Sequence, residues 1–165
     1  MSRDFSLTPR SGFASADRSS FAEVEQDFTR ITGTELVPPI LEKVGGPAAI
    51  LNGNRQVVYA NRAMTEVAGK TELREILGLR LGEVLGCDMV NDSLGGCGTN
   101  RECRKCGAIN AVLASMGGRA VTNQAAIEVE RAGLERVMQF TISTTPLSHE
   151  GRSYVLLVLT ELTVR

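Results

Sequence analysis

The chain has 165 residues, of which 42% are hydrophobic and 22% are charged, so it is long enough for one domain with a substantial core. Its 18 basic and 19 acidic residues leave a formal net charge of -1 without a basic stripe, which argues against a protein that binds nucleic acid or anionic membranes. No apolar run approaches membrane-spanning length, and the first twenty residues lack the apolar stretch of a secretory signal, so we expect a cytoplasmic protein.

The beginning of the chain changes from an irregular to a helical pattern. Residues 1–19 are rich in Ser, Arg and Asp without a hydrophobic period, which predicts a flexible leader. Ser20 and Glu23 then form a capping box, which predicts the start of a helix. The apolar residues that follow recur at spacings of three and four and form one stripe: Phe21, Val24, Phe28 and Ile31. With a second short helix over 38–44, residues 20–45 form an N-terminal helical segment, whose stripe either is a dimer seam or covers a sheet.

Residues 46–165 combine short strands, short helices and three long strands. Two short strands over 48–51 and 56–60 flank a turn of Asn and Gly, and Asn61 is placed to cap a short helix. Short helical turns follow, and a second capping box at Thr99 and Glu102 predicts a longer helix that ends at Gly117. Alternating apolar and polar residues predict three further strands, over 120–131, 134–145 and 153–163.

This order of elements resembles the PAS sensory domain over roughly residues 34–163. The resemblance is carried by the segment AAILNGNRQVVYANRAM, in which Tyr59-Ala60-Asn61 matches the usual end of the second strand, and by the tail FTISTTPLSHEGRSYVLLVLTELT. It implies an α+β fold in which helices cover one face of a five-stranded antiparallel sheet, preceded by N-terminal helices. It also implies a signalling role without catalysis, and an amphipathic helix before the core that commonly packs against a second copy.

All four cysteines of the chain lie in the segment 86–107: Cys87, Cys97, Cys103 and Cys106. Cys103 and Cys106 are three residues apart on the predicted helix, so we expect their sulfurs on one face of its first turns, where the helix dipole stabilises thiolates. Cys97 lies just before the predicted cap, and a glycine-rich loop allows Cys87 to fold back toward the same point. This clustering predicts one common site, in the region where PAS sensors usually hold a ligand or cofactor. The segment looks like those of cysteine-bearing PAS modules in bacterial sensor kinases.

The cysteine spacing leaves three kinds of chemistry open. Four thiolates in a glycine-rich loop of a sensory module favour an iron–sulfur cluster, with four irons preferred over two. Cys103 and Cys106, followed by Gly107, also resemble one knuckle of a four-cysteine zinc site. A pair of cysteines separated by two residues at a helix start further suits a dithiol–disulfide switch.

We therefore expect a redox-sensing or oxygen-sensing PAS protein that is not an enzyme. The only histidine, His149, lies in a polar turn away from the cysteines, so a Cys–His catalytic pair is not expected. Because no kinase, cyclase or nucleotide-binding motif follows the PAS-like region, the expected output is a partner protein in trans, a kinase or a regulator. We also expect a homodimer, with neither nucleic acid nor membrane as a partner.

Overall fold

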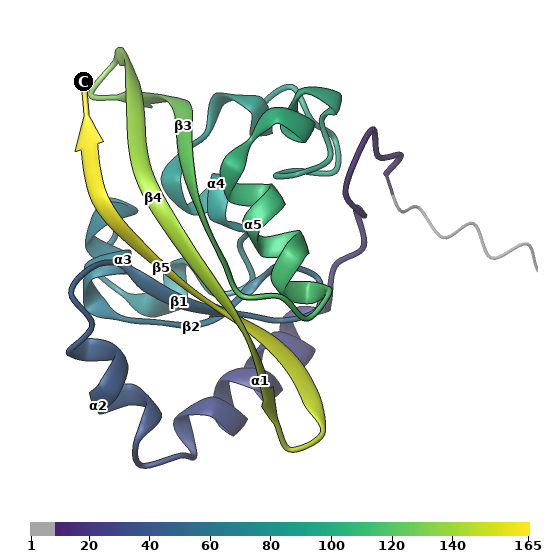
Figure 1. Ribbon diagram of the computed structural model, residues 1–165, viewed down its shortest axis with the longest axis vertical. Coiled ribbons are helices and arrows are strands. Elements are labelled where there is room, and N and C mark those ends of the chain that lie inside the picture. Colours follow the sequence, from purple (N-terminus) through teal and green to yellow (C-terminus); the bar gives the residue numbers. More distant parts are fainter. Residues whose placement is uncertain (1–8) are drawn as a thin grey trace, which may run out of the picture.

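Five antiparallel strands form one twisted sheet in this computed structural model, which describes residues 9–165 (Figure 1). The strands pair in the order β2-β1-β5-β4-β3, so that the long strands at the end of the chain make up the centre and one edge. Their bounds are β1 (Ala48–Leu51), β2 (Val57–Ala60), β3 (Val121–Arg131), β4 (Leu134–His149) and β5 (Arg152–Val164). The predicted α+β fold with a five-stranded antiparallel sheet is confirmed.

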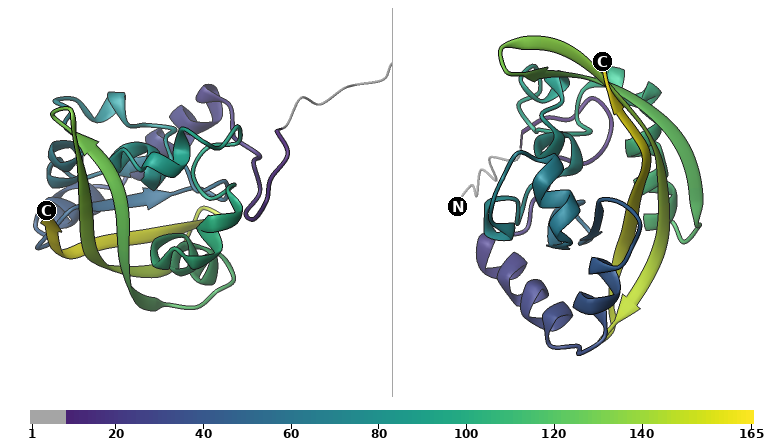
Figure 2. Two further views of the ribbon diagram at one scale, coloured as in Figure 1. Left: turned by 90° about the horizontal axis from the view of Figure 1, so that it is seen from above. Right: turned by 90° about the vertical axis from the view of Figure 1, so that its left-hand side faces the viewer.

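Helices cover both faces of the sheet, and each face has its own apolar core (Figures 1 and 2). One face carries α3 (Arg62–Val67), α4 (Leu81–Leu85), α5 (Gly107–Met116) and three single 3-10 turns, Leu73–Glu75, Asp88–Val90 and Arg101–Lys105. The other face carries α1 (Phe21–Thr32) and α2 (Val37–Glu42). Strand β1 is buried on both sides because both faces are covered there: Ala49 and Leu51 belong to one core, and Ala48 and Ile50 to the other. Within residues 9–165, no helix is both long and apolar enough to cross a membrane.

Helix α1 uses its apolar stripe to cover the sheet of its own chain. The Ser20–Glu23 capping box is present, as predicted. Val24 and Ile31 are buried against β1, β2 and β5, whereas Phe21 at the start of the helix is 54% exposed. Of the two roles left open for the stripe, the cover of the sheet is the one that the packing supports.

The segment before α1 lies against the rest of the molecule. Residues 12–19, which we call the N-terminal strap, run from the cysteine-bearing loop (residues 86–107) to the side chain of Gln56. The main-chain N–H of Gly12 donates to the carbonyl of Thr99 at 2.8 Å, and that of Ser19 donates to the Gln56 side chain at 2.8 Å. These contacts differ from the flexible leader expected over 1–19; residues 1–8 of that leader lie outside the described part of the chain.

A buried carboxylate fastens α1 to the sheet. The Tyr154 hydroxyl on β5 donates to Asp27 on α1 at 2.6 Å, and the Arg30 guanidinium donates to the same oxygen at 3.2 Å. Burial, followed by the hydrogen bond to Asp27, raises the pKa of Tyr154 to about 12. The hydroxyl therefore remains protonated and available as a donor throughout the physiological pH range.

Replacing Tyr154 by Phe is expected to lower the free energy of unfolding by about 1–2 kcal/mol, because Asp27 stays buried with one donor fewer. Urea denaturation at neutral pH measures the change. Ser143→Ala removes an exposed hydroxyl contact to Thr122 and serves as the control, with an effect within about 0.5 kcal/mol. Equal stability of Tyr154→Phe and the parent chain would show that the contact does not fasten α1.

Candidate cysteine site

All four cysteines line a single cavity between α5, the cysteine-bearing loop and the sheet. The cavity has a volume of about 430 Å³ and lies under α4 and α5, on the core face of β3 and β4. Its walls are largely aliphatic and aromatic, including Leu81, Leu85, Ile109, Val112, Ile127 and Phe140. The structure thus brings together the residues that the sequence grouped, and all four are free thiols.

The helical geometry predicted for Cys103 and Cys106 is wrong in detail. Asn100, and not Thr99, is the cap: its side chain accepts from the Glu102 N–H at 2.9 Å, while the Thr99 hydroxyl donates to the carbonyl of Gly96 at 2.8 Å. The turn that follows is a 3-10 helix holding Cys103, and α5 begins only after Cys106, its N-cap residue. The two cysteines therefore lie on either side of a junction between two helices.

Cys97 is held against α4 at a position where only glycine fits. The Gly82 N–H donates to the Cys97 sulfur at 3.3 Å. A Cβ at Gly82 would lie 2.8 Å from that sulfur and 3.3 Å from the Cβ of Cys87, so the absence of a side chain lets both cysteines approach the helix. Burial raises the pKa of the Cys97 thiol to about 12, although the Gly82 N–H acts in the opposite direction. Without a bound cation this thiol is therefore neutral at pH 7.

Cys87 and Cys106 connect the site to the sheet. The backbone of Cys87 forms an isolated antiparallel bridge with Val129 on β3, which places its side chain at the sheet edge. Burial, together with the negative charge of neighbouring thiolates, raises the pKa of Cys87. Cys106 packs against the main core, and also against a small cluster formed by Ala14, Cys103 and Ile109.

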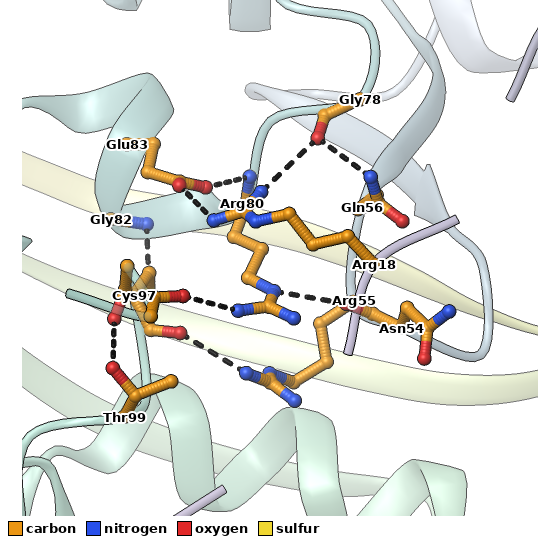
Figure 3. Close-up of polar contacts among 12 residues, drawn as sticks. Arg18, Asn54, Arg55, Gln56, Gly78, Arg80, Gly82, Glu83, Cys97 and Thr99 are labelled. Carbon is orange, nitrogen blue, oxygen red and sulfur yellow. Dashed lines mark hydrogen bonds and ion pairs between the residues drawn. The ribbon is translucent and has the colours of Figure 1, made fainter. Parts of the chain in front are cut away.

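Two buried arginines beside the cavity are part of the site that sequence reasoning missed (Figure 3). The guanidinium of Arg55 donates to the carbonyl of Cys97 at 3.1 Å, and that of Arg80 donates to the carbonyl of Gly95 at 3.0 Å. Burial is the main cause that lowers the pKa of each, for Arg80 to about 10, so both remain charged at neutral pH. By contrast, Lys105, between Cys103 and Cys106 in the sequence, is exposed and pairs with Glu102.

The thiols line the cavity without converging on one point. Among residues 9–165 no group of three or more His, Cys, Asp and Glu side chains is arranged to hold a single metal ion. The donor set, the aliphatic walls and the N–H contact at Cys97 are nevertheless compatible in their chemistry with an iron–sulfur cluster.

Comparisons with known proteins identify the fold. No protein-family model matches the chain, and no curated protein sequence matches it either. The PAS domain of nitrogen regulation protein NR(II) from Vibrio parahaemolyticus is 13% identical with a TM-score of 0.50, over 77% of this chain and 98% of that domain. The PAS domain of an HTR-like protein from Haloarcula marismortui is 14% identical with a TM-score of 0.50, over 78% and 91%. The LOV protein of Rhodobacter sphaeroides is 16% identical with a TM-score of 0.50, over 82% and 67%. The chain has the PAS fold, as the resemblance in its sequence predicts.

Gly82→Ala is expected to destabilise the protein by about 1–3 kcal/mol, because the added methyl group overlaps the Cys97 sulfur. The loss occurs even though alanine by itself favours the helix by about 1 kcal/mol. In a Cys97→Ala background the overlap with sulfur is absent and only the contacts with the Cβ atoms at positions 97 and 87 remain, at 3.2 and 3.3 Å, so the same substitution should cost less than in the parent chain. Gly53→Ala, at a turn with open space around the Cβ, is the matched control. Additive effects of Gly82→Ala and Cys97→Ala in thermal or urea denaturation would contradict this close contact.

Proposed function

We propose that this chain is a PAS-type sensory protein whose four cysteines bind an iron–sulfur cluster and report redox or oxygen state to a partner protein. The single observation that carries the proposal is that Cys87, Cys97, Cys103 and Cys106 line one largely apolar cavity of a PAS fold. Solved structures of the same fold include domains of sensor kinases, which supports a signalling role over an enzymatic one. We assign no catalytic residue.

The proposed ligands and their surroundings suit an anionic centre. The four thiolates would hold the cluster, which supplies reversible one-electron chemistry and sensitivity to oxygen when bound. The Gly82 N–H donates to the Cys97 sulfur and favours its thiolate form. Leu81, Ile109 and Phe140 limit the access of water to the cavity. Arg55 and Arg80 place two positive charges beside it.

A cluster is preferred over the two alternatives for geometric reasons. Tetrahedral zinc needs four sulfurs about 2.3 Å from one point, whereas the thiols here surround a cavity. A cluster of four irons holds each thiolate at a different corner, so it suits ligands spread around a larger space, and more so than a cluster of two. A dithiol–disulfide switch would use Cys103 and Cys106, which lie across the junction between the 3-10 turn and α5. Zinc and the disulfide switch are outcomes of the first experiment below.

The proposed signal begins at the cysteine-bearing loop. Loss or oxidation of the cluster would release segment 86–107, which carries the ligands and opens α5. The partner would be a kinase or a regulator that binds the protein in trans. It would recognise which of its two states segment 86–107 adopts. We place the protein in the cytoplasm, where free thiols such as these are kept reduced.

We further propose that the protein forms a homodimer through apolar residues that α1 and α2 leave exposed. Val24 and Ile31 are occupied within the chain, so they cannot form the interface. Three apolar residues remain largely exposed: Phe21 begins α1, Leu36 ends the connection to α2, and Ile40 lies within α2. An exposed apolar surface of this kind is typical of a contact with a second copy.

Protein purified without oxygen is expected to be brown, to absorb visible light, and to contain iron and acid-labile sulfide in matching amounts. Each of the four Cys→Ala variants should lose most of the iron, because each removes one thiolate ligand. Exposure to air should bleach the parent protein. Colourless protein with one zinc per chain would contradict the cluster and support a structural zinc site. Metal-free protein that forms a Cys103–Cys106 disulfide would contradict the cluster and support the dithiol–disulfide switch.

Ile40→Glu is expected to convert the dimer to a folded monomer, because it places a charge in the apolar contact without disturbing a buried residue. Light scattering gives the molar mass, and circular dichroism verifies the fold. Glu66→Lys, an exposed charge change on α3, is the control and should remain dimeric. A dimer that survives both Ile40→Glu and Phe21→Glu would place the interface elsewhere.

A further inference from the structure

Two main-chain hydrogen bonds join the N-terminal strap to the cysteine-bearing loop. The N–H groups of Gly12 and Ala14 donate to the carbonyls of Thr99 and Gly98 at 2.8 and 2.9 Å. The Ala14 side chain is buried in the small cluster that contains Cys103. The strap therefore contacts both the backbone and the side chains of the site on one side of the cavity.

Small residues make this contact close. A Cβ at Gly95 of the loop would lie 2.9 Å from the Cβ of Ala16, and a Cβ at Gly12 would lie 2.7 Å from the Cγ of Arg101. A side chain at either glycine would therefore push the strap and the loop apart. The strap and the loop thus fit each other at specific residues along their length.

Two arginines join the strap to the loop through main-chain carbonyls. Arg80 donates to Asp17 of the strap at 2.6 Å as well as to Gly95 of the loop at 3.0 Å. Arg55 donates to Ser15 of the strap at 2.9 Å as well as to Cys97 of the loop at 3.1 Å. Each guanidinium therefore bridges the same two segments, and Figure 3 shows the two side chains extending side by side toward the loop.

The charge of these arginines has no carboxylate partner in the part of the chain that the structure describes. Arg80 is 1% exposed and Arg55 is 3% exposed, and no carboxylate of residues 9–165 forms an ion pair with either guanidinium. Glu83, the nearest candidate, pairs with Arg18 and accepts from the main-chain N–H of Arg80. Buried cations require nearby negative charge or a full set of acceptors, so thiolates in the adjacent cavity would strengthen the bridge.

We propose that Arg55 and Arg80 are positioning residues that clamp the N-terminal strap onto the cysteine-bearing loop, so that the state of the cysteine site is transmitted to α1 through the strap. The strap continues directly into Ser20, the cap of α1, and so reaches that helix without passing through the sheet. Which cofactor occupies the cysteine site rests on the proposed function. The clamp itself rests only on the contacts described here.

The clamp is tested first in reduced, metal-free protein. Arg55→Lys removes the guanidinium nitrogen, Nη2, that donates to both carbonyls, and Gly12→Val pushes the strap away from Arg101 without altering an arginine or a cysteine. Both variants should increase hydrogen exchange of residues 12–19 about tenfold and should speed alkylation of Cys97 and Cys103 by iodoacetamide. Arg131→Lys is the matched control, since Arg131 also donates to two carbonyls, those of Val67 and Leu85, away from the strap. Exchange and alkylation rates equal to those of the parent chain in both strap variants would overturn the clamp.

The route to α1 is tested with protein reconstituted with ferrous iron and sulfide, or with zinc chloride. In the parent chain, removal of the metal should increase exchange in the strap and in the first turn of α1. In Gly12→Val at equal metal content, α1 should no longer respond. A response of α1 that persists in Gly12→Val would overturn the strap route and favour transmission through the sheet. If neither metal binds, the proposed function fails, whereas the metal-free comparison still decides whether the clamp exists.

Discussion

The approach of α5 to the sheet at Gly107 is the contact on which the rest of the cysteine site depends. A Cβ at this position would overlap the carbonyl oxygen of Gln124 on β3, so the helix can begin this close to the strand only with glycine. The Asn123 side chain donates to the Gly107 carbonyl at 3.1 Å and fixes the same spacing from the strand. Because Cys106 immediately precedes Gly107, this approach determines how near the last cysteine lies to the sheet. It also brings Ala108 and Val112 into the main core, which forms one wall of the cavity.

Much of the fold could be predicted because its signals are local. The turn between β1 and β2 and the cap at Asn61 follow from neighbouring residues, and the structure has them as predicted: the Asn61 side chain accepts from the Met64 N–H. The cap predicted at Thr99 is instead formed by the next residue, Asn100, which is also a good capping residue. The Asn100 side chain accepts from the Glu102 N–H, while the Thr99 hydroxyl donates to the Gly96 carbonyl within the folded loop.

The cysteine site was predictable in its members but not in its surroundings. Four cysteines within twenty positions are expected to lie near one another, and the structure places all four on one cavity. Arg55 and Arg80 had no local signal, because arginines in and beside turns are usually exposed and these two are buried by segments distant in sequence. The strap was missed for a similar reason, since a polar stretch without a hydrophobic period gives no indication of backbone pairing with a loop more than eighty residues away.

The isolated bridge between Cys87 and Val129 has a consequence for the behaviour of the protein at high concentration. Strand β3 is the edge of the sheet, and an edge of unpaired N–H and carbonyl groups is a template for pairing with another chain. Glu128 and Glu130 place charges along this edge, while the bridge occupies the backbone between them. A loop that withdraws from Val129 therefore uncovers the backbone near the end of an eleven-residue edge strand. The same segment that contains the cysteines thus protects the molecule against edge-to-edge aggregation, and damage to the site would reduce solubility even while the sheet itself remained folded.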